Sequence, residues 1–295
     1  MRLRSLCAKT DSMEVTVMKF VIILFACVLL SATALATVEE KPVIRTHAVQ
    51  INVDDMDKAL SFYCAKLGFE IDSRENYPHR VSLKTNDRIK LILNLVKRLR
   101  KPDPEDTSAA FTLQVNDLDQ AIARMKSIGV ELAETEKRKE GVGYAISIRD
   151  PFGRNISLMH QTIVKVEPFK EPRLYNFGYK VPDMSAARDF YSGKLGFVER
   201  SEKYLPLDMP LGHSDKSFAF MLHYRPGVKP VKSDYQKAAP FNIFIFETVD
   251  LGRAVSALKA SGVRILSAQK DAVSNYIIFE DPFGNITELI ESPVK

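Results

Sequence analysis

His223, Tyr224 and Arg225 stand side by side in the sequence and bring together an imidazole, a phenol and a guanidinium. This run can offer hydrogen bonds and a positive charge to a bound molecule, although a surface loop would explain it equally well. Cys64 lies within a helical pattern of apolar residues, which favours a small buried side chain over a nucleophile. The sequence therefore points first to a binding site.

The residues from Ala48 to Gly68 predict the elements that would position such groups. Apolar and polar side chains alternate up to Val53, and this period of two residues indicates a strand with two different faces. Gln50 and Asn52 lie on the polar face. Asp55 is the expected N-cap of the following helix, and Gly68 is expected to end that helix in the left-handed conformation.

The same order of residues occurs twice in the chain. The segment from Val53 to Phe69 carries the patterns Val-x-Asp-Met, Phe-Tyr and Lys-Leu-Gly-Phe, and Val181 to Phe197 repeats them. Further matched blocks include an Asp-Pro-Phe-Gly hairpin turn in each copy, and the three blocks are offset by 128, 133 and 131 residues. We therefore expect an α+β protein with one module at residues 43–163, a linker at 164–172 and a second module at 173–292.

Residues 1–36 have the features of a secretory signal peptide. An apolar run from Val21 to Leu30 follows a basic residue, and small residues precede the expected cleavage site after Ala36. The run is shorter than the roughly 20 residues that span a bilayer. We expect a secreted or periplasmic protein with no membrane association after cleavage.

Two details of this leader stay open. Asp11 and Glu14 make its first part unusual, so Met18 is an alternative to Met1 as the start. Lipidation at Cys27 is the second interpretation, because Phe25 stands where a smaller residue is usual.

Composition indicates a folded globular protein, with 45% hydrophobic and 27% charged residues. Without residues 1–36 the chain has 38 basic and 35 acidic residues, which is close to neutral. The basic run from Lys97 to Lys101 has no interleaved aromatic residues, so it predicts a solvated loop and no nucleic-acid partner. The expected partner is a small molecule, and a homodimer stays open.

The repeated blocks, together with the closing segment from Asp281 to Leu289, resemble the vicinal oxygen chelate superfamily of glyoxalases, bleomycin-resistance proteins and extradiol dioxygenases. The resemblance covers nearly the whole chain after the leader. It implies two tandem βαβββ modules whose sheets curl into a cup. In that family a divalent metal inside the cup chelates adjacent oxygens of the substrate.

The resemblance also implies where the metal ligands would lie, and most of these positions hold poor ligands. The positions are Ala48, Asn176, about Ala110, about Ile243, Ser157 and Glu288. A catalytic metal site generally needs three His or carboxylate ligands, and only Glu288 qualifies. We therefore predict no cofactor; a divalent metal, if one bound, would have Glu288 and His47 as ligands.

His47 lies one residue from an expected ligand position. Strand alternation turns it with Val49 toward the helices, which favours a hydrogen-bonded structural histidine. A shift of the strand register by one residue would bring it into the cup.

Three functions are compatible with the sequence. The favoured one is an exported protein that binds a small polar organic ligand in the cup between the modules without a metal. The alternative is a metal-dependent lyase or isomerase of the glyoxalase type with Glu288 as base or ligand; an extradiol dioxygenase is weaker, because it needs two His and one carboxylate on iron. In the third, the modules form a scaffold whose cup is filled by Phe244 and Phe246. The candidate ligand-binding residues are Gln50, Asn52, Asn176, Lys180, His223, Tyr224 and Glu288.

Overall fold

The computed structural model describes most of the chain after the leader. The described residues are 43–85, 89–101, 103, 105, 110–163, 165–200, 208–212, 220–231, 238–270 and 275–292. The expected signal peptide, with Met18 and Cys27, lies outside them. Residues 41–295 form one compact unit. Within the described ranges, no helix is both long and apolar enough to cross a membrane.

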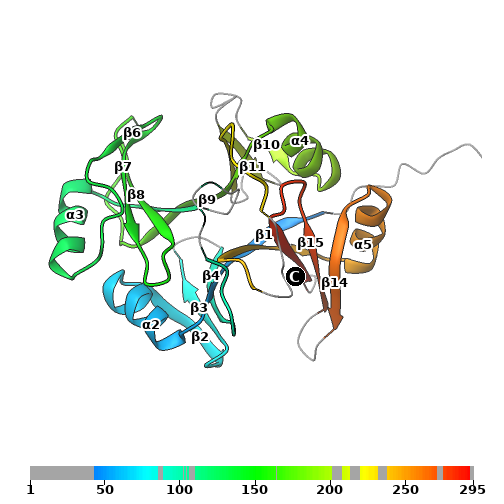
Figure 1. Cartoon of the computed structure of the whole chain (residues 1–295), viewed down its shortest axis with the longest axis horizontal. Helices are drawn as coiled ribbons and strands as arrows, with labels where there is room; N and C mark the ends of the chain where they lie inside the picture. Colours follow the sequence, from blue (N-terminus) through cyan, green and yellow to red (C-terminus); the bar gives the residue numbers. More distant parts are fainter. Residues whose placement is uncertain are drawn as a thin grey trace, which may run out of the picture. The chain divides into compact units, whose positions relative to one another are not determined.

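The first repeat contains two strand-helix-strand units (Figure 1). The first unit consists of β1 (Arg45–Val53), α2 (Met56–Leu60) continued by the π-helical segment η1 (Ser61–Lys66), β2 (Glu70–Asn76), β3 (Arg80–Lys84) and β4 (Lys90–Leu95). The second unit consists of β5 (Ala110–Gln114), α3 (Leu118–Ser127), β6 (Arg138–Glu140), β7 (Gly143–Arg149) and β8 (Asn155–Gln161).

The second repeat has the same two units. The first consists of β9 (Arg173–Val181), α4 (Met184–Arg188) continued by η2 (Asp189–Lys194), β10 (Val198–Glu199), β11 (Asp208–Gly212) and β12 (Phe220–Tyr224). The second consists of β13 (Asn242–Thr248), α5 (Leu251–Ala260), β14 (Arg264–Lys270), β15 (Asn275–Glu280) and β16 (Ile286–Glu291).

An aspartate begins the helix of each unit. The side chains of Asp55, Asp117, Asp183 and Asp250 each accept a hydrogen bond from the backbone N–H three residues on, at 2.8–3.0 Å. Such caps satisfy N–H groups that have no partner inside the helix. Gly68 follows the first helical segment with φ +89°. The predicted cap and stop of this helix are therefore confirmed.

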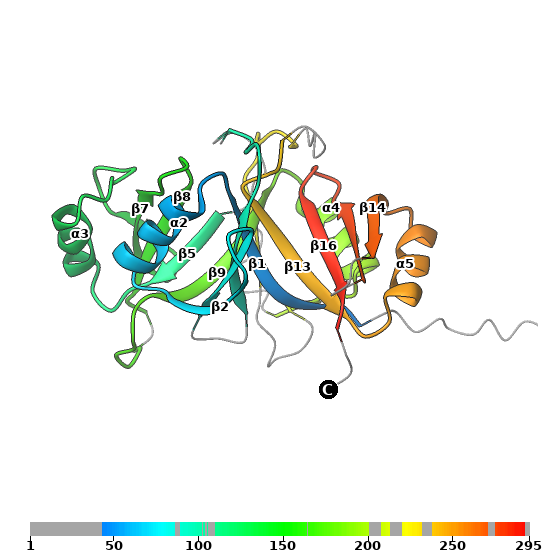
Figure 2. The ribbon, with the colours of Figure 1, turned by 90° about the horizontal axis from the view of Figure 1, so that it is seen from below.

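The strands form two eight-stranded sheets, and each sheet takes half of its strands from each repeat (Figures 1 and 2). One has the order β14-β15-β16-β13-β1-β4-β3-β2, and the other has the order β10-β11-β12-β9-β5-β8-β7-β6. The antiparallel pairs β1 with β13 and β5 with β9 join the repeats at the centre of each sheet. Neither sequence module completes a sheet by itself.

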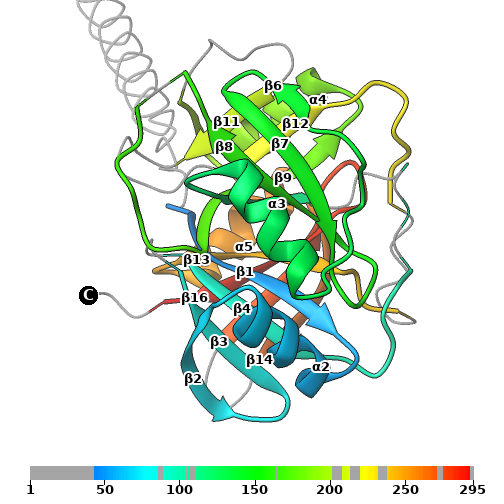
Figure 3. The same cartoon turned by 90° about the vertical axis from the view of Figure 1, so that its left-hand side faces the viewer.

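The two sheets pack against each other through their apolar faces, and the helices complete this core (Figure 3). Phe244 of β13 contacts Phe177 and Tyr179 of β9, with ring centroids 4.8 and 4.9 Å apart. Phe244 and Phe246 are fully buried here. The prediction that these two rings fill the cup is wrong, because strand alternation directs both to the core side of their sheet.

Each sheet has a second face that points away from the core. The first face, called the β1/β13 face, carries Ala48, Gln50, Asn52, Asn94, Ile92, Ile245 and Glu288. The other, called the β5/β9 face, carries Thr112, Ser147, Ser157, Asn176, Gly178, Lys180, Met221 and His223. The ligand-binding residues predicted from the sequence are thereby divided between two faces.

Candidate ligand-binding site

Three neutral polar side chains lie in one row across the β5/β9 face. Asn176 of β9 is opposite Thr112 of β5, and Thr112 is opposite Ser157 of β8. Thr112 is 9% exposed, whereas Ser157 and Asn176 are half-buried. The side chains of Thr112 and Asn176 make no hydrogen bond to any described residue. The row therefore presents hydroxyl and amide groups that a bound molecule can use.

Arg138 of β6 extends this row. Its guanidinium donates to the Oγ atoms of Ser147 at 3.3 Å and Ser157 at 3.5 Å. Because both hydroxyls accept from Arg138, their O–H groups remain available as donors. Arg138 also forms ion pairs with Glu134 and Glu140. Two carboxylates thus more than offset the single positive charge at this end of the face.

Gly178 makes room for a histidine side chain on the β5/β9 face. A Cβ atom at this position would lie 2.2 Å from the backbone oxygen of Met221 and 2.9 Å from Nε2 of His223. The imidazole of His223 therefore lies over the glycine, with Lys180 as its neighbour in register on β9. A side chain at position 178 would exclude the imidazole from this place.

A third part of the face, around Gln114 and Gln161, is closed by hydrogen bonds between its own side chains. Gln114 Nε2 donates to Gln161 Oε1 at 2.7 Å, and Gln161 Nε2 donates to the Tyr175 hydroxyl at 2.7 Å. Tyr175 stands at an irregularity in the β5–β9 register next to Asn176. An aromatic side chain thus borders the polar row.

The polar side chains at the equivalent place on the β1/β13 face bond to one another. Gln50 Nε2 and Asn94 Nδ2 both donate to Asn52 Oδ1 at 2.9 Å, and Asn52 Nδ2 donates to the Pro240 carbonyl at 2.8 Å. Gln50 is 5% exposed and Asn52 is 1% exposed. The amides of Gln50, Asn52 and Asn94 therefore bond within the protein.

The internal repeat makes the comparison between the faces direct. Asn52 pairs in register with Asn94 on one face, and the equivalent pair on the other face is Lys180 with His223. Gln50 has Gly178 as its counterpart, two residues earlier on the same strands. The side chain that fills the first face is therefore absent from the second.

The residues at the expected metal-ligand positions do not fit a catalytic metal. In register, the two rows are Ala48, Ile245 and Glu288 on one face and Asn176, Thr112 and Ser157 on the other. The middle positions are thus Ile245 and Thr112, two residues beyond the expected Ile243 and Ala110. Ala48, Ile92 and Ile245 contact one another in a small apolar cluster next to Glu288. Among the described residues, no three His, Cys, Asp or Glu side chains converge on one point.

His47 does not point with Val49 to the core, because β1 has a bulge between Thr46 and Ala48. Its Nδ1 atom lies 2.8 Å from Glu247 Oε2. Glu247 is two residues from Ile245 on β13, so the two side chains point to the same side of the sheet. The expected orientation of His47 was therefore wrong, but a hydrogen-bonded histidine at the start of the strand is what the structure contains.

Strand alternation corrects the prediction for Tyr224 and adds two residues to the face. Tyr224 pairs with the buried Val181, so it lies on the core side of β12 and does not accompany His223. Sequence reasoning missed Thr112 and Arg138. Thr112 had a signal, because it alternates with the buried Phe111 and Leu113, whereas Arg138 lies in a short edge strand with no such pattern.

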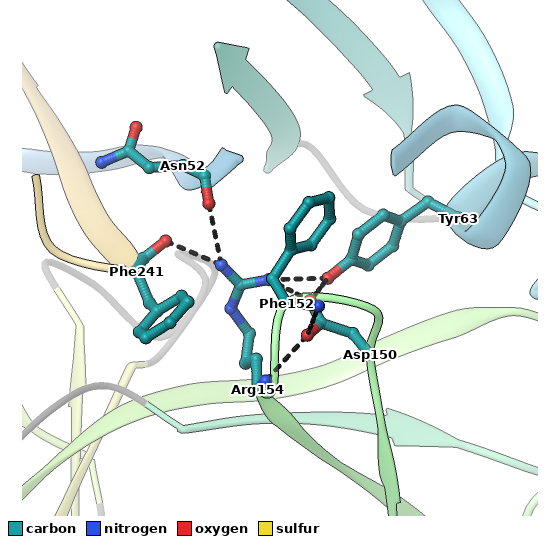
Figure 4. A network of polar contacts seen from close by, with 6 residues as sticks. All are labelled: Asn52, Tyr63, Asp150, Phe152, Arg154 and Phe241. Carbon is teal, nitrogen blue, oxygen red and sulfur yellow. Dashed lines mark hydrogen bonds and ion pairs between the residues drawn. The ribbon is translucent and has the colours of Figure 1, made fainter. Parts of the chain in front are cut away.

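A buried arginine ties the two sheets together (Figure 4). Arg154, at the Asp-Pro-Phe-Gly turn between β7 and β8, donates to the backbone oxygens of Asn52 at 3.1 Å and Phe241 at 3.0 Å. Its guanidinium also pairs with Asp150, and the hydroxyl of Tyr63 donates to Asp150 Oδ2 at 2.8 Å. The turn of one sheet thereby holds the central strands of the other.

The second copy of this turn lacks the arginine. Asp281 accepts from the Tyr191 hydroxyl at 2.8 Å and from Asn285 Nδ2 at 2.9 Å, where Asn285 replaces Arg154. Burial raises the pKa of Asp281 to about 6, although the hydrogen bonds from Asn285 and Tyr191 act in the opposite direction. Burial also raises the pKa of Tyr191 well above its ordinary value.

Comparison with known proteins agrees with this architecture. The structure is similar to glyoxalase I from Zea mays, with 19% identity, a TM-score of 0.63, and coverage of 84% of this chain and 92% of that one. It is also similar to a putative dioxygenase from Bacillus subtilis, with 12% identity, a TM-score of 0.58, and coverage of 86% and 87%. A comparison with curated proteins gives no match. The sequence matches one protein family over residues 45–158 and 174–289, and the chain therefore belongs to the Glyoxalase/Bleomycin resistance protein/Dioxygenase superfamily.

Proposed function

We propose that this protein binds a small polar organic molecule on the β5/β9 face and does so without a catalytic metal. The difference between the two equivalent faces is the observation that supports this proposal. At Gly178 the imidazole of His223 takes the place that the Gln50 side chain has on the β1/β13 face, and Thr112 and Asn176 present polar groups without partners among the described residues where Ala48 and Ile245 are apolar. Buried polar groups are normally hydrogen-bonded, so side chains without protein partners at an accessible position favour an external partner.

The glyoxalase-type alternative gains no support from the geometry around Glu288. Its neighbour in register is Ile245, and the next residue in that row is Ala48. Neither side chain can bind a metal, so Glu288 would need ligands from elsewhere. A binding protein is therefore the function that the described residues fit best.

Methyl NMR can test the proposal, because the two faces carry different methyl-bearing residues at equivalent positions. Met221 lies on the β5/β9 face, and Ile92 and Ile245 lie on the β1/β13 face. The purified protein, labelled with ¹³C at Met and Ile methyls, is screened against a library of small polar metabolites. We expect saturable shifts at Met221 that disappear in the Asn176→Leu variant, with Ile92 and Ile245 unchanged. Shifts confined to the isoleucines, or no shifts in the whole library, would reject the proposal.

Export is a further part of the proposal, resting on the leader pattern of residues 1–36. Expression of the full chain in a host with an export pathway, followed by intact-mass measurement, provides the test. A purified protein that begins at Thr37 agrees with cleavage after Ala36. A mass that retains the leader, or one that carries a lipid on Cys27, contradicts it. Native mass spectrometry of the same sample reports whether the protein is a monomer or a homodimer.

A further inference from the structure

We infer that the ligand of the β5/β9 face is a neutral, polyhydroxylated molecule of the carbohydrate class. This inference rests on the proposed function and specifies the chemistry of its ligand. Four observations lead to it: the neutral row, the charged groups around that row, the unbonded amide of Asn176 at its end, and the aromatic side chain beside it.

The central row consists of uncharged groups that both donate and accept. Thr112 and Ser157 offer hydroxyls, and Asn176 offers an amide with two donors and an acceptor. Neighbouring strands are about 4.8 Å apart, and hydroxyls on alternate carbons of a sugar ring are separated by a similar distance. Two hydroxyls on alternate carbons of one ring can therefore meet side chains of two neighbouring strands, such as Thr112 and Ser157.

Cationic groups on this face already interact within the protein. Arg138 forms ion pairs with Glu134 and Glu140. On β9 and β12, Lys180 is next to His223 in register, and each of the two has an interaction with another group of the protein. An anionic ligand would gain most from an uncompensated cation. An apolar ligand would leave the polar groups of Thr112 and Asn176 buried without partners, which is unfavourable.

The amide of Asn176 and an aromatic side chain complete the set of groups. The amide of Asn176 makes no bond to a described residue and can contact two neighbouring oxygens, as adjacent hydroxyls of a sugar present them, whereas the guanidinium nitrogens of Arg138 already donate within the protein. Tyr175 borders the row, and its hydroxyl accepts from Gln161 Nε2 at 2.7 Å. An aromatic ring offers an apolar surface to the C–H groups of a sugar while its hydroxyl stays hydrogen-bonded.

The experiment uses the same labelled protein with defined probes. D-glucose, D-mannose, D-ribose and sorbitol represent neutral polyols, and D-gluconate and L-lactate represent acids of similar or smaller size. We expect at least one neutral polyol to shift the Met221 methyl with saturation, while its acid counterpart binds more weakly. The Thr112→Val variant keeps the shape of the side chain and removes its hydroxyl, so polyol affinity should fall about fivefold. Ile245→Val is the matched variant on the β1/β13 face and should leave affinity unchanged.

The outcomes separate this inference from the proposed function. If the acids shift Met221 and the polyols do not, the site is a ligand site but its ligand is not a neutral polyol. If no probe shifts Met221, the carbohydrate class is rejected, whereas the metabolite library still decides the binding function. If polyols bind equally well to the Thr112→Val protein, the assignment of the row is wrong. A methyl spectrum without ligand that keeps the dispersion and the remaining signals of the natural protein confirms that each variant is folded.

Discussion

The pH dependence of stability should differ between the natural protein and an Asp281→Asn variant. Asp281 is fully buried, and its pKa of about 6 in the folded protein exceeds its ordinary value of 3.8. A group whose folded pKa is raised stabilises the fold below its unfolded pKa and loses that contribution as the pH rises through its folded pKa. Asp281 should therefore lower the free energy of unfolding as the pH increases from about 4 to about 6.

The magnitude follows from the two pKa values. A difference of about two pH units corresponds to about 3 kcal/mol, at about 1.4 kcal/mol for each unit. The asparagine of the variant carries no titrating charge, and its amide oxygen can still accept the N–H groups of Phe283 and Asn285 that bond Asp281 Oδ1 at 2.9 and 2.8 Å. The variant should therefore fold and lack this part of the pH dependence.

Urea unfolding followed by circular dichroism at pH 4, 5, 6 and 7 measures the effect. The difference in unfolding free energy between the variant and the natural protein should change by about 3 kcal/mol across this range. Asp54→Asn, which alters an exposed carboxylate, serves as the control and should preserve the natural profile. A variant with the same pH profile as the natural protein would refute the reasoning, because it would show that burial does not shift the pKa of Asp281.

Three other substitutions test the rest of the structure. Arg154→Met removes both hydrogen bonds to the opposite sheet and leaves a buried carboxylate without its cation, so urea unfolding should show a loss of about 3–5 kcal/mol. Gly178→Ala places a Cβ atom 2.2 Å from a backbone oxygen and should lower the melting temperature, whereas Gly141→Ala meets nothing within 4 Å and should not. Asn52→Leu removes the acceptor of the buried Gln50 amide and the half-buried Asn94 amide and should cost about 2–3 kcal/mol in the same unfolding assay, whereas Asn176→Leu should abolish ligand binding with little change in stability.

Local elements followed from the sequence because their causes are local. Asp55 caps its helix through an N–H only three residues away, and Gly68 ends that helix because it tolerates a positive φ. The alternation around Gln50 identified a strand and its polar face, and the repeated blocks identified the duplication. The family followed from those blocks as well, since they lie at the ends of elements where the backbone demands particular residues.

Strand pairing between distant segments was outside the reach of periodicity. The sequence modules suggested one shared cup, but the pairing of β1 with β13 and β5 with β9 created two faces on two sheets. The candidates Gln50 and Asn52 were separated from Lys180 and His223 for this reason. Likewise, the bulge at His47 depends on its partner strand and changed the direction of a side chain that simple alternation assigned to the core.

The sequence by itself therefore determined the repeated strand-helix units and the two faces of strands such as β1. It also determined that few residues at the expected ligand positions can bind a metal. These properties depend on residue types at short spacing. Tertiary structure alone decided which of two equivalent faces fills its centre with a glutamine amide and which with an imidazole from a neighbouring strand. That choice depends on Gly178 meeting Met221 and His223 from another strand, while Gln50 is held by Asn52 and Asn94 on the other sheet. Contacts across strands distant in sequence have no local signature, so only the fold could place them.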